Sequence, residues 1–306
     1  MDLILSTLNS AIRLTTPIAY VTLGAVIMEK AGINALAMEG IMLSGAFGAV
    51  LGSWIFNSAL AGVIMAILLA VLVAELRGWL CISHQGDQTV SGIGINILVS
   101  GATAMLLKVI WGLNGKSESV ASLSDWTIPG LNRIPIVGDL FGTQNPLVYL
   151  LLLIIPACWY LVNKTGFGLR ITVAGEKPEV LSSLGLRVSK YRYCAVLIAG
   201  ILTGLGGAYL SIGQLSFFSN DMTSGRGYMA LAACVFGRWS VLGGIAGALL
   251  FGLADAIQMR LQSGVAYTQF VQMIPYVVTL LVLCCKFGKG SFAAPAAQGK
   301  VYKEQQ

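Results

Sequence analysis

Charged side chains are scarce in this chain. Lysine, arginine, aspartate and glutamate account for 10% of the 306 residues, whereas soluble domains carry about 25%. So few charges cannot cover the surface of an ordinary soluble domain, and hydrophobic residues make up 56% of the sequence. Apolar stretches of about 20 residues, the length that crosses a bilayer as a helix, recur from end to end. The sequence predicts an all-α polytopic membrane protein with a single domain, residues 1–306.

Histidine is almost absent, and the cysteines lack metal-binding spacing. His84 is the only histidine, and the six cysteines include no C-x-x-C pair, so neither a metal site nor a Ser-His-Asp triad can be assembled. The run Gly112 to Ser117 resembles a phosphate-binding loop, but Ile110 stands where its first glycine belongs. We therefore predict no catalytic residue, cofactor or metal. Transport against a gradient would need energy from another protein.

The apolar stretches predict about nine membrane crossings, within bounds of eight and ten. They lie at residues 11–28, 35–56, 59–81, 90–112, 146–162, 194–213, 217–236, 241–258 and 270–286. The segment 217–236 is the weak one because it contains Asp221 and Arg226, and a charged side chain facing lipid costs about 2.5–3.5 kcal/mol. A broken or re-entrant helix is the alternative there, and Gly225 and Gly227 favour a break.

Positive charge is concentrated in residues 163–192, which hold six cations and two acids. Short loops this basic stay on the cytoplasmic side of a membrane. Residues 114–145 then form an external loop, and 287–306 form a cytoplasmic tail. The loop and the tail account for most of the net charge of +6, so the charge does not imply a nucleic-acid partner. The N-terminus lacks the basic region of a cleavable signal, so we expect the first span to be retained.

Within this basic segment we expect a short helix. Pro178 suits the first turn, Glu179 lies near the positive end of the helix dipole, and Gly185 can supply a left-handed stop. A helix of about two turns is marginal alone in water. We therefore expect it to dock on another protein, with a surface helix on lipid headgroups as the alternative.

Polar residues at membrane depth are few, and such residues usually line a path or bond neighbouring helices. Those predicted inside or beside the spans are Tyr20, Glu39, Asn96, Gln214, Asp221, Arg226, Asp255, Gln258, Gln269 and Gln272. Small residues also recur at four-residue spacing, in the stripe Gly40, Ser44, Gly48 and Gly52 and in two stripes over residues 243–252. We interpret these stripes as tight helix packing, with a moving interface as the alternative.

A series of motifs extends from residue 16 to residue 258. They are Thr16-Pro-Ile-Ala-Tyr20, Glu29-Lys-Ala-Gly-Ile33, Met38-Glu-Gly-Ile-Met-Leu-Ser-Gly-Ala-Phe47, Gln88-Thr-Val-Ser-Gly-Ile-Gly-Ile-Asn96, Phe167-Gly-Leu-Arg170, Ala174-Gly-Glu-Lys-Pro-Glu179, Gly204-Leu-Gly-Gly-Ala-Tyr-Leu210, Gly225-Arg-Gly-Tyr-Met-Ala-Leu-Ala232, Phe236-Gly-Arg-Trp239 and Leu250-Phe-Gly-Leu-Ala-Asp-Ala-Ile-Gln258. With its motifs in this order, the chain resembles permease subunits of ATP-binding-cassette (ABC) importers for nucleosides and simple sugars. This branch also includes ribose and branched-chain amino-acid permeases. The last pieces are more similar to the nucleoside group.

The resemblance implies a type II importer-like helix bundle in the bacterial cytoplasmic (inner) membrane. It implies four kinds of partner: an ABC ATPase subunit, a second permease subunit in a heterodimer, an extracytoplasmic substrate-binding lipoprotein and the lipid bilayer. In this family a cytoplasmic helix inserts into a cleft on the ATPase. The matching coupling residues here are Gly168, Arg170, Gly175, Glu176, Pro178, Glu179 and Gly185. One departure is that Ala35 and Ala37 replace the family's usual Asn and Gly, which puts a local turn and a substrate contact in doubt.

For the substrate, we expect nucleosides carried by alternating access. Nucleosides need a stacking surface and a few hydrogen-bonding groups. The expected path residues are Tyr20, Glu39, Asn96, Gln214, Phe217, Asn220, Tyr228, Asp255 and Gln258. A simple sugar would use the same amides, and riboflavin or a branched-chain amino acid stays open because the external protein sets selectivity. The rival class is an ion-coupled transporter using Glu39 or Asp255, and an intramembrane enzyme is a weaker rival.

Overall fold

The computed structural model describes residues 2–112, 115–127, 142–262, 273, 277, 294–300 and 302. Its elements are α1 (Asp2–Lys30), α2 (Met38–Phe56), α3 (Ala59–Gly78), the π-helical turn η1 (Trp79–Ser83), α4 (Gln88–Trp111), β1 (Trp126–Thr127), β2 (Thr143–Gln144), α6 (Pro146–Lys164), α7 (Gly166–Glu176), α8 (Pro178–Ser183), α9 (Val188–Ala208), the π-helical turn η3 (Tyr209–Gly213), α10 (Arg226–Phe236) and α11 (Val241–Gln262). The two short strands pair antiparallel, Trp126 with Gln144 and Thr127 with Thr143. The prediction of an all-α membrane bundle is confirmed.

Seven of the described helices are long and apolar enough to cross a membrane. They correspond to seven of the predicted spans. A continuous helix over 217–236 is not found, because α10 begins only at Arg226 and has 11 residues. At 1.5 Å per residue it is about 16 Å long, half of a bilayer core, so the broken-helix alternative is the one the structure has. The predicted span 270–286 lies outside the described residues, apart from Met273 and Val277.

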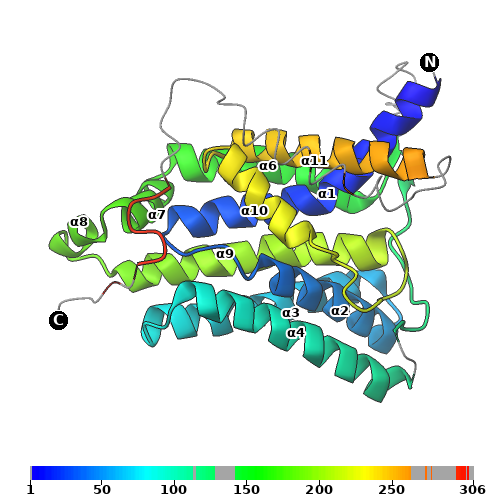
Figure 1. Ribbon diagram of the computed structural model, residues 1–306, viewed down its shortest axis with the longest axis horizontal. Helices are drawn as coiled ribbons and strands as arrows, with labels where there is room; N and C mark the ends of the chain where they lie inside the picture. The colour runs from blue at the N-terminus through cyan, green and yellow to red at the C-terminus, as the bar shows by residue number, and fades with distance from the viewer. Residues whose placement is uncertain are drawn as a thin grey trace.

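Helix α1 forms the centre of the bundle (Figure 1). It contacts α9, α10 and α11, and also α6 and α7. Every residue from Thr15 to Glu29 is buried, so α1 has no face that could meet lipid over this length. A helix that is apolar on all sides is expected in such a position.

Small residues let the other helices approach closely. A Cβ on Gly207 of α9 would lie 2.4 Å from the Met42 carbonyl oxygen of α2. Gly48 and Gly52 of α2 pack against α3, while Gly244 and Gly252 of α11 pack against α1. The small-residue stripes therefore serve helix packing in the described fold.

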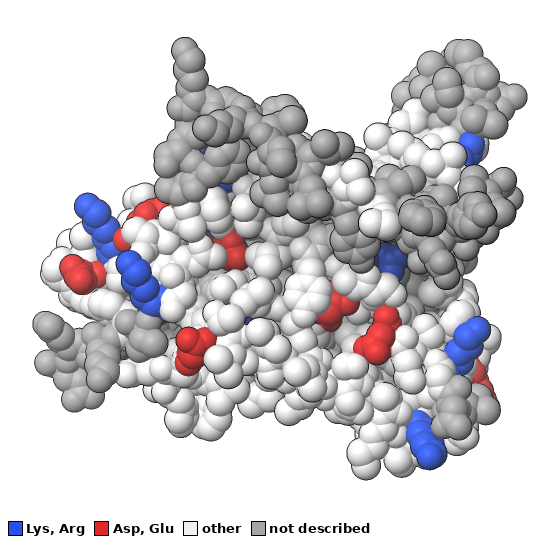
Figure 2. All heavy atoms as spheres, in the orientation of Figure 1, with Lys and Arg blue, Asp and Glu red and all other residues white. Residues whose placement is uncertain are grey.

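The bundle has two distinct ends. We call the end that holds α7, α8 and the start of α9 the basic end; residues 294–300 also lie there, where the Ala297 N–H donates to the Gly175 carbonyl at 2.8 Å. We call the other end, which holds residues 115–127, the loop end. There the Ser117 N–H donates to the Phe218 carbonyl at 2.8 Å. On the face in Figure 2, lysines and arginines gather mainly at the two ends.

The last turn of α11 lies at the loop end, because the Arg260 guanidinium donates to the Ser6 hydroxyl of α1. The end of α11 and the segment 294–300 are therefore at opposite ends of the bundle. The sequence analysis expected the loop end outside the cell and the basic end inside, and this orientation stays a prediction.

The orientation can be tested by cysteine labelling after the six native cysteines are replaced. We expect an impermeant thiol reagent applied to intact cells to label Ser122→Cys at the loop end, where residue 122 is exposed. Ser183→Cys at the basic end is also exposed and should react only in opened membranes. Labelling of Ser183→Cys from outside would reverse the orientation.

Candidate functional site

The chain breaks its helical path between α9 and α10. Residues 214–225 run without a helix from the loop end, where the Asn220 N–H donates to the Gly115 carbonyl at 3.0 Å, to Gly225, the N-cap of α10. Gly225 has φ +84°, a left-handed conformation that glycine adopts without steric cost. Midway along α4, the Ser100 hydroxyl donates to the Asp221 carboxyl at 2.7 Å. The break therefore lies at an exposed position partway along the length of the bundle, and α10 covers only the remaining distance to the basic end.

Glu39 of α2 completes the start of α10. Its two carboxyl oxygens accept the N–H groups of Gly225 and Gly227, at 2.8 and 2.7 Å. Helix starts leave such N–H groups without intrahelical partners, and a carboxyl group also suits the positive end of the helix dipole. A Cβ on Gly227 would lie 2.5 Å from the Glu39 backbone nitrogen. Glycine at 227 is therefore what lets Glu39 come this close.

Asn96 of α4 completes the start of α2 in a similar way. Its Oδ1 accepts the Gly40 N–H at 2.8 Å, and its Nδ2 donates to the Leu36 carbonyl and to the Tyr228 hydroxyl, both at 2.8 Å. The N-cap of α2 is Ala37, which has no capping side chain. The asparagine on a neighbouring helix thus supplies the cap that alanine cannot. The Tyr228 contact also joins this cap to α10.

Around the break the surface is polar and partly exposed. We call Asn96, Ser100, Asp221, Ser224 and Tyr228 the α10 surface; Asp221 and Ser224 are exposed, and Tyr228 is 45% exposed. Figure 2 shows acidic side chains near the middle of the face on which α10 lies. Polar groups at membrane depth are costly against lipid and normally face a partner or a water-filled path. The α10 surface is therefore the main candidate functional site.

The structure brings three of the nine expected path residues together, namely Glu39, Asn96 and Tyr228. It places Tyr20 elsewhere, fully buried with its hydroxyl donating to the Leu147 carbonyl at 2.7 Å, so Tyr20 offers no exposed surface in this conformation. Three of the remaining expected residues lie in the segment between α9 and α10: Gln214 lines a cavity, the Phe217 ring lies beneath the Lys116 ammonium, and Asn220 is exposed. The other two, Asp255 and Gln258, are half-buried on α11, and Arg226 is an electrostatic neighbour of Asp255. Gln269 and Gln272 lie outside the described residues.

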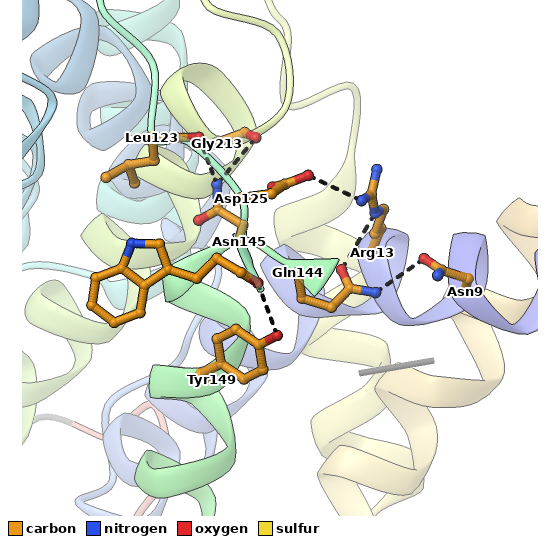
Figure 3. A network of polar contacts seen from close by, with 9 residues as sticks. Asn9, Arg13, Leu123, Asp125, Gln144, Asn145, Tyr149 and Gly213 are labelled. Atoms are coloured by element: carbon orange, nitrogen blue, oxygen red, sulfur yellow. Dashed lines mark hydrogen bonds and ion pairs between the residues drawn. The ribbon is translucent and has the colours of Figure 1, made fainter. Parts of the chain in front are cut away.

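The cavity beside Gln214 opens at the loop end and has a volume of about 670 Å³. It is lined by Arg13, Asp125, Asn145, Tyr209, Gln214 and Arg260, among others. Figure 3 shows how its wall is built: Arg13 forms an ion pair with Asp125 at 3.2 Å and also donates to the Gln144 side chain. Asn145 donates to the Leu123 and Gly213 carbonyls and caps α6. Apart from Gln214, this site could not be predicted from the sequence, because its residues come from distant segments.

At the basic end, two helices fill the predicted coupling segment. Helix α8 starts at Pro178, and Gly185 follows it with φ +73°, as expected from the sequence. Helix α7 was not predicted. It packs tightly against its neighbours. A Cβ on Gly168 would lie 2.2 Å from the Leu161 carbonyl oxygen, and a Cβ on Gly175 would lie 2.2 Å from the Lys30 carbonyl oxygen.

The polar coupling residues have different surroundings. Arg170 donates to the Tyr191 hydroxyl at 3.2 Å, and Glu176 accepts the Ala296 N–H at 3.3 Å. Glu179 is exposed. Next to these, Leu184 is 70% exposed. Two apolar side chains, Val180 of α8 and Leu184 just beyond it, are therefore accessible to solvent here.

Sequence reasoning missed the buried polar groups near this end. The Glu29 carboxyl, on a residue that is 1% exposed, accepts from the Trp239 indole and from the Ala35 N–H. Arg77 is fully buried and donates to the Asn34 and Gln88 carbonyls. Both residues lie near the ends of predicted spans, where a single charged residue is common. Their position in the sequence therefore could not show that they are buried.

The family model described as "Branched-chain amino acid transport system / permease component" matches residues 7–283. The chain is 33% identical to the nucleoside ABC transporter permease protein NupC of Lactococcus lactis subsp. cremoris, over 94% of this chain and 93% of the relative. It is also 33% identical to the guanosine ABC transporter permease protein NupQ of Bacillus subtilis, over 94% and 92%. A putative glucose ABC transporter permease protein, TsgC13 of Haloferax volcanii, is 34% identical over 84% and 78%.

Two solved structures share the fold. One is an inward-facing conformation of a putative metal-chelate type ABC transporter, with a TM-score of 0.55, 16% identity and coverage of 90% of this chain and 86% of that chain. The other is PsaBC from Streptococcus pneumoniae in complex with Fab, with a TM-score of 0.52, 12% identity and coverage of 90% of each chain. At these identities the likeness concerns the fold alone.

The capping role of Glu39 can be tested by substitution. Glu39→Ala leaves the partly buried N–H groups of Gly225 and Gly227, at the start of α10, without an acceptor, which should lower the free energy of unfolding by about 2 kcal/mol. We expect a lower thermal midpoint in detergent, and a smaller decrease for Glu39→Gln, which keeps one oxygen acceptor. Glu118→Ala, at an exposed acid of the loop end, is the matched control. An unchanged midpoint for Glu39→Ala would show that the cap is not stabilising.

Proposed function

Because the chain belongs to the permease-component family of branched-chain amino acid transport systems, we propose that it is the membrane-spanning subunit of an ATP-driven importer of nucleosides. It is a multi-pass membrane protein and a transport component, and ATP hydrolysis takes place on a separate subunit. The observation that carries the transport proposal is the α10 surface. A polar, partly exposed surface at membrane depth, next to a helix that starts there, is what a solute path requires.

The path lies between two permease subunits. Asp221, Ser224 and Tyr228 of the α10 surface face away from the core, so a second subunit opposite them would enclose a polar channel. As the family resemblance implies, the second subunit is a different permease chain, so the pair is a heterodimer. In alternating access the channel opens to one side of the membrane at a time. The outward-open and inward-open conformations of the complete transporter bind nucleotide with different affinity, and this difference drives the change.

The ATPase subunit docks at the basic end, which we place in the cytoplasm. The exposed Val180 of α8 and Leu184, its C-cap, provide apolar side chains for a cleft, and Glu179 provides an acid at the helix start. Of the expected coupling residues, Gly168 and Gly175 act by holding α7 against α6 and α1. An extracytoplasmic binding lipoprotein delivers the solute at the loop end, where the 670 Å³ cavity provides polar groups and the Arg13–Asp125 pair.

Nucleosides are the favoured substrates for two reasons. Relatives that match over most of their length are a nucleoside and a guanosine permease. In addition, the α10 surface combines the exposed ring of Tyr228 with the exposed Asp221 and Ser224, and an aromatic face with nearby hydrogen-bonding groups suits a base and a ribose. A simple sugar is the second candidate, because the putative glucose permease is equally similar in sequence.

Docking on α8 can be tested with one substitution and a matched control. Leu184→Asp places a charge in the apolar surface, and burying an unpaired carboxylate in a cleft is unfavourable. We expect the ATPase subunit to be lost on co-purification, whereas the transporter still inserts. Leu215→Asp changes an exposed leucine at the loop end and should keep the ATPase. If Leu184→Asp also keeps it and stimulates it normally, α8 is not the docking element.

The substrate can be tested in proteoliposomes that hold the complete transporter and its cognate binding protein. We expect ATP-dependent uptake of guanosine, adenosine or cytidine, and none when the ATPase subunit is omitted. Uptake of ribose or glucose alone would refute the nucleoside assignment but keep the importer. Uptake driven by a sodium or proton gradient without the ATPase would refute the importer and favour the ion-coupled alternative.

A further inference from the structure

A segment near the C-terminus is bound across the basic end. We call residues 294–300 together with Tyr302 the C-terminal strap. The Ala297 N–H donates to the Gly175 carbonyl at 2.8 Å, and the Gly299 N–H donates to the Gly32 carbonyl at 3.2 Å. Ala297 is buried. The strap therefore joins the end of α7 to the turn that follows α1.

One end of the strap is attached to the coupling helices. The Tyr302 hydroxyl and the Ser182 hydroxyl of α8 are hydrogen-bonded at 2.7 Å. The Tyr302 ring packs against a separate small hydrophobic cluster that includes Leu181 of α8 and Tyr191 of α9. In addition, Glu176 accepts the Ala296 N–H at 3.3 Å. The strap thus contributes to the core that positions α8.

The other end of the strap is attached to the end of α10. The Gly299 N–H bonds the Gly32 carbonyl, the Gly32 N–H bonds the Glu29 carbonyl at 2.9 Å, and the Gln298 side chain lies beside the buried carboxyl of Glu29. The same carboxyl accepts from the Trp239 indole and, at 3.8 Å, from the Cys234 thiol. Cys234 lies in α10 and Trp239 just beyond it. Glu29 is therefore shared by α1, the strap and the basic end of α10.

We infer that the C-terminal strap couples α8 to α10, with Gln298 and Tyr302 as positioning residues. The inference rests on the proposed docking of the ATPase on α8. A displacement of α8 reaches the strap through Tyr302, and the strap passes it through Gln298 and Glu29 to Trp239, at the end of the helix that carries the α10 surface. The route consists of packed side chains and hydrogen bonds between named groups, which is the kind of contact network that carries coupling between sites.

Two conservative variants test this route in the complete transporter. Gln298→Leu removes the polar group beside Glu29 with little change in size, and Tyr302→Phe removes the bond to Ser182 but keeps the ring in its cluster. We expect both to keep the ATPase subunit and to hydrolyse ATP at the wild-type rate. The solute imported per ATP should fall about tenfold, which corresponds to about 1.4 kcal/mol of coupling free energy. Lys300→Ala, at an exposed strap residue, is the control and should match wild type.

The outcomes separate this inference from the proposed function. If Gln298→Leu imports as much solute per ATP as wild type, the strap carries no coupling, whereas docking on α8 is unaffected. If Gln298→Leu loses the ATPase subunit, the strap is part of the docking site and the inference is wrong. If Leu184→Asp keeps normal ATPase coupling, the proposed docking itself fails.

A cross-link between the strap and α8 provides a second measurement. Ser182→Cys with Tyr302→Cys, in a background without native cysteines, can be joined by a short bifunctional thiol reagent. Both substitutions remove the Tyr302–Ser182 contact, so the uncross-linked variant should import less solute per ATP than wild type, and the cross-link, which rejoins the strap to α8, should raise that ratio. Loss of import after cross-linking would show that α8 and the strap must separate, and would overturn the inference.

Discussion

A bilayer core offers no water to backbone groups, so a helix that begins inside it must find its hydrogen-bond acceptors in the protein. This constraint governs the region around α10. Helix α10 begins at Arg226, and the Glu39 carboxyl accepts two N–H groups at its start. Glu39 itself lies in the first turn of α2, whose own start is completed by Asn96. The break, the polar surface and the contact between α2, α4 and α10 therefore depend on two side chains.

The remainder of the fold provides a rigid frame for this region. Helix α1 is buried from Thr15 to Glu29, and glycines bring α2, α3, α9 and α11 close to their neighbours, as Gly207 does against Met42. Close backbone approach increases van der Waals contact, which is the main source of helix association where no hydrophobic driving force exists. A core packed in this way resists small deformations. Movement is then confined to segments with fewer contacts.

Much of this architecture could be predicted from the sequence, because span length and charge placement are properties of single segments. Seven helices and the short helix at Pro178 follow from such local patterns. The roles of single polar residues could not be predicted in this way. Tyr20 and Glu39 both appeared as polar groups at membrane depth, yet Tyr20 bonds a core carbonyl and Glu39 caps a helix from another segment. Asn145 and Glu29 depend on partners far away in the chain, so only the tertiary structure reveals them.

Helix α10 is held at its two ends by carboxyl groups from different helices. Glu39 of α2 bonds its first turn, and Glu29 of α1 bonds Cys234 and Trp239 at its other end. Helix α1 is enclosed by the core, whereas α10 leaves Tyr228 45% exposed and adjoins an exposed, non-helical segment at Asp221. Segments with exposed backbone and few buried contacts open at lower free energy than the core. A shift of α10 relative to the frame would break a few hydrogen bonds at its ends, whereas a shift of α1 would require repacking of the whole bundle. Of these two helices, α10 is therefore the one that can change conformation at the smaller cost.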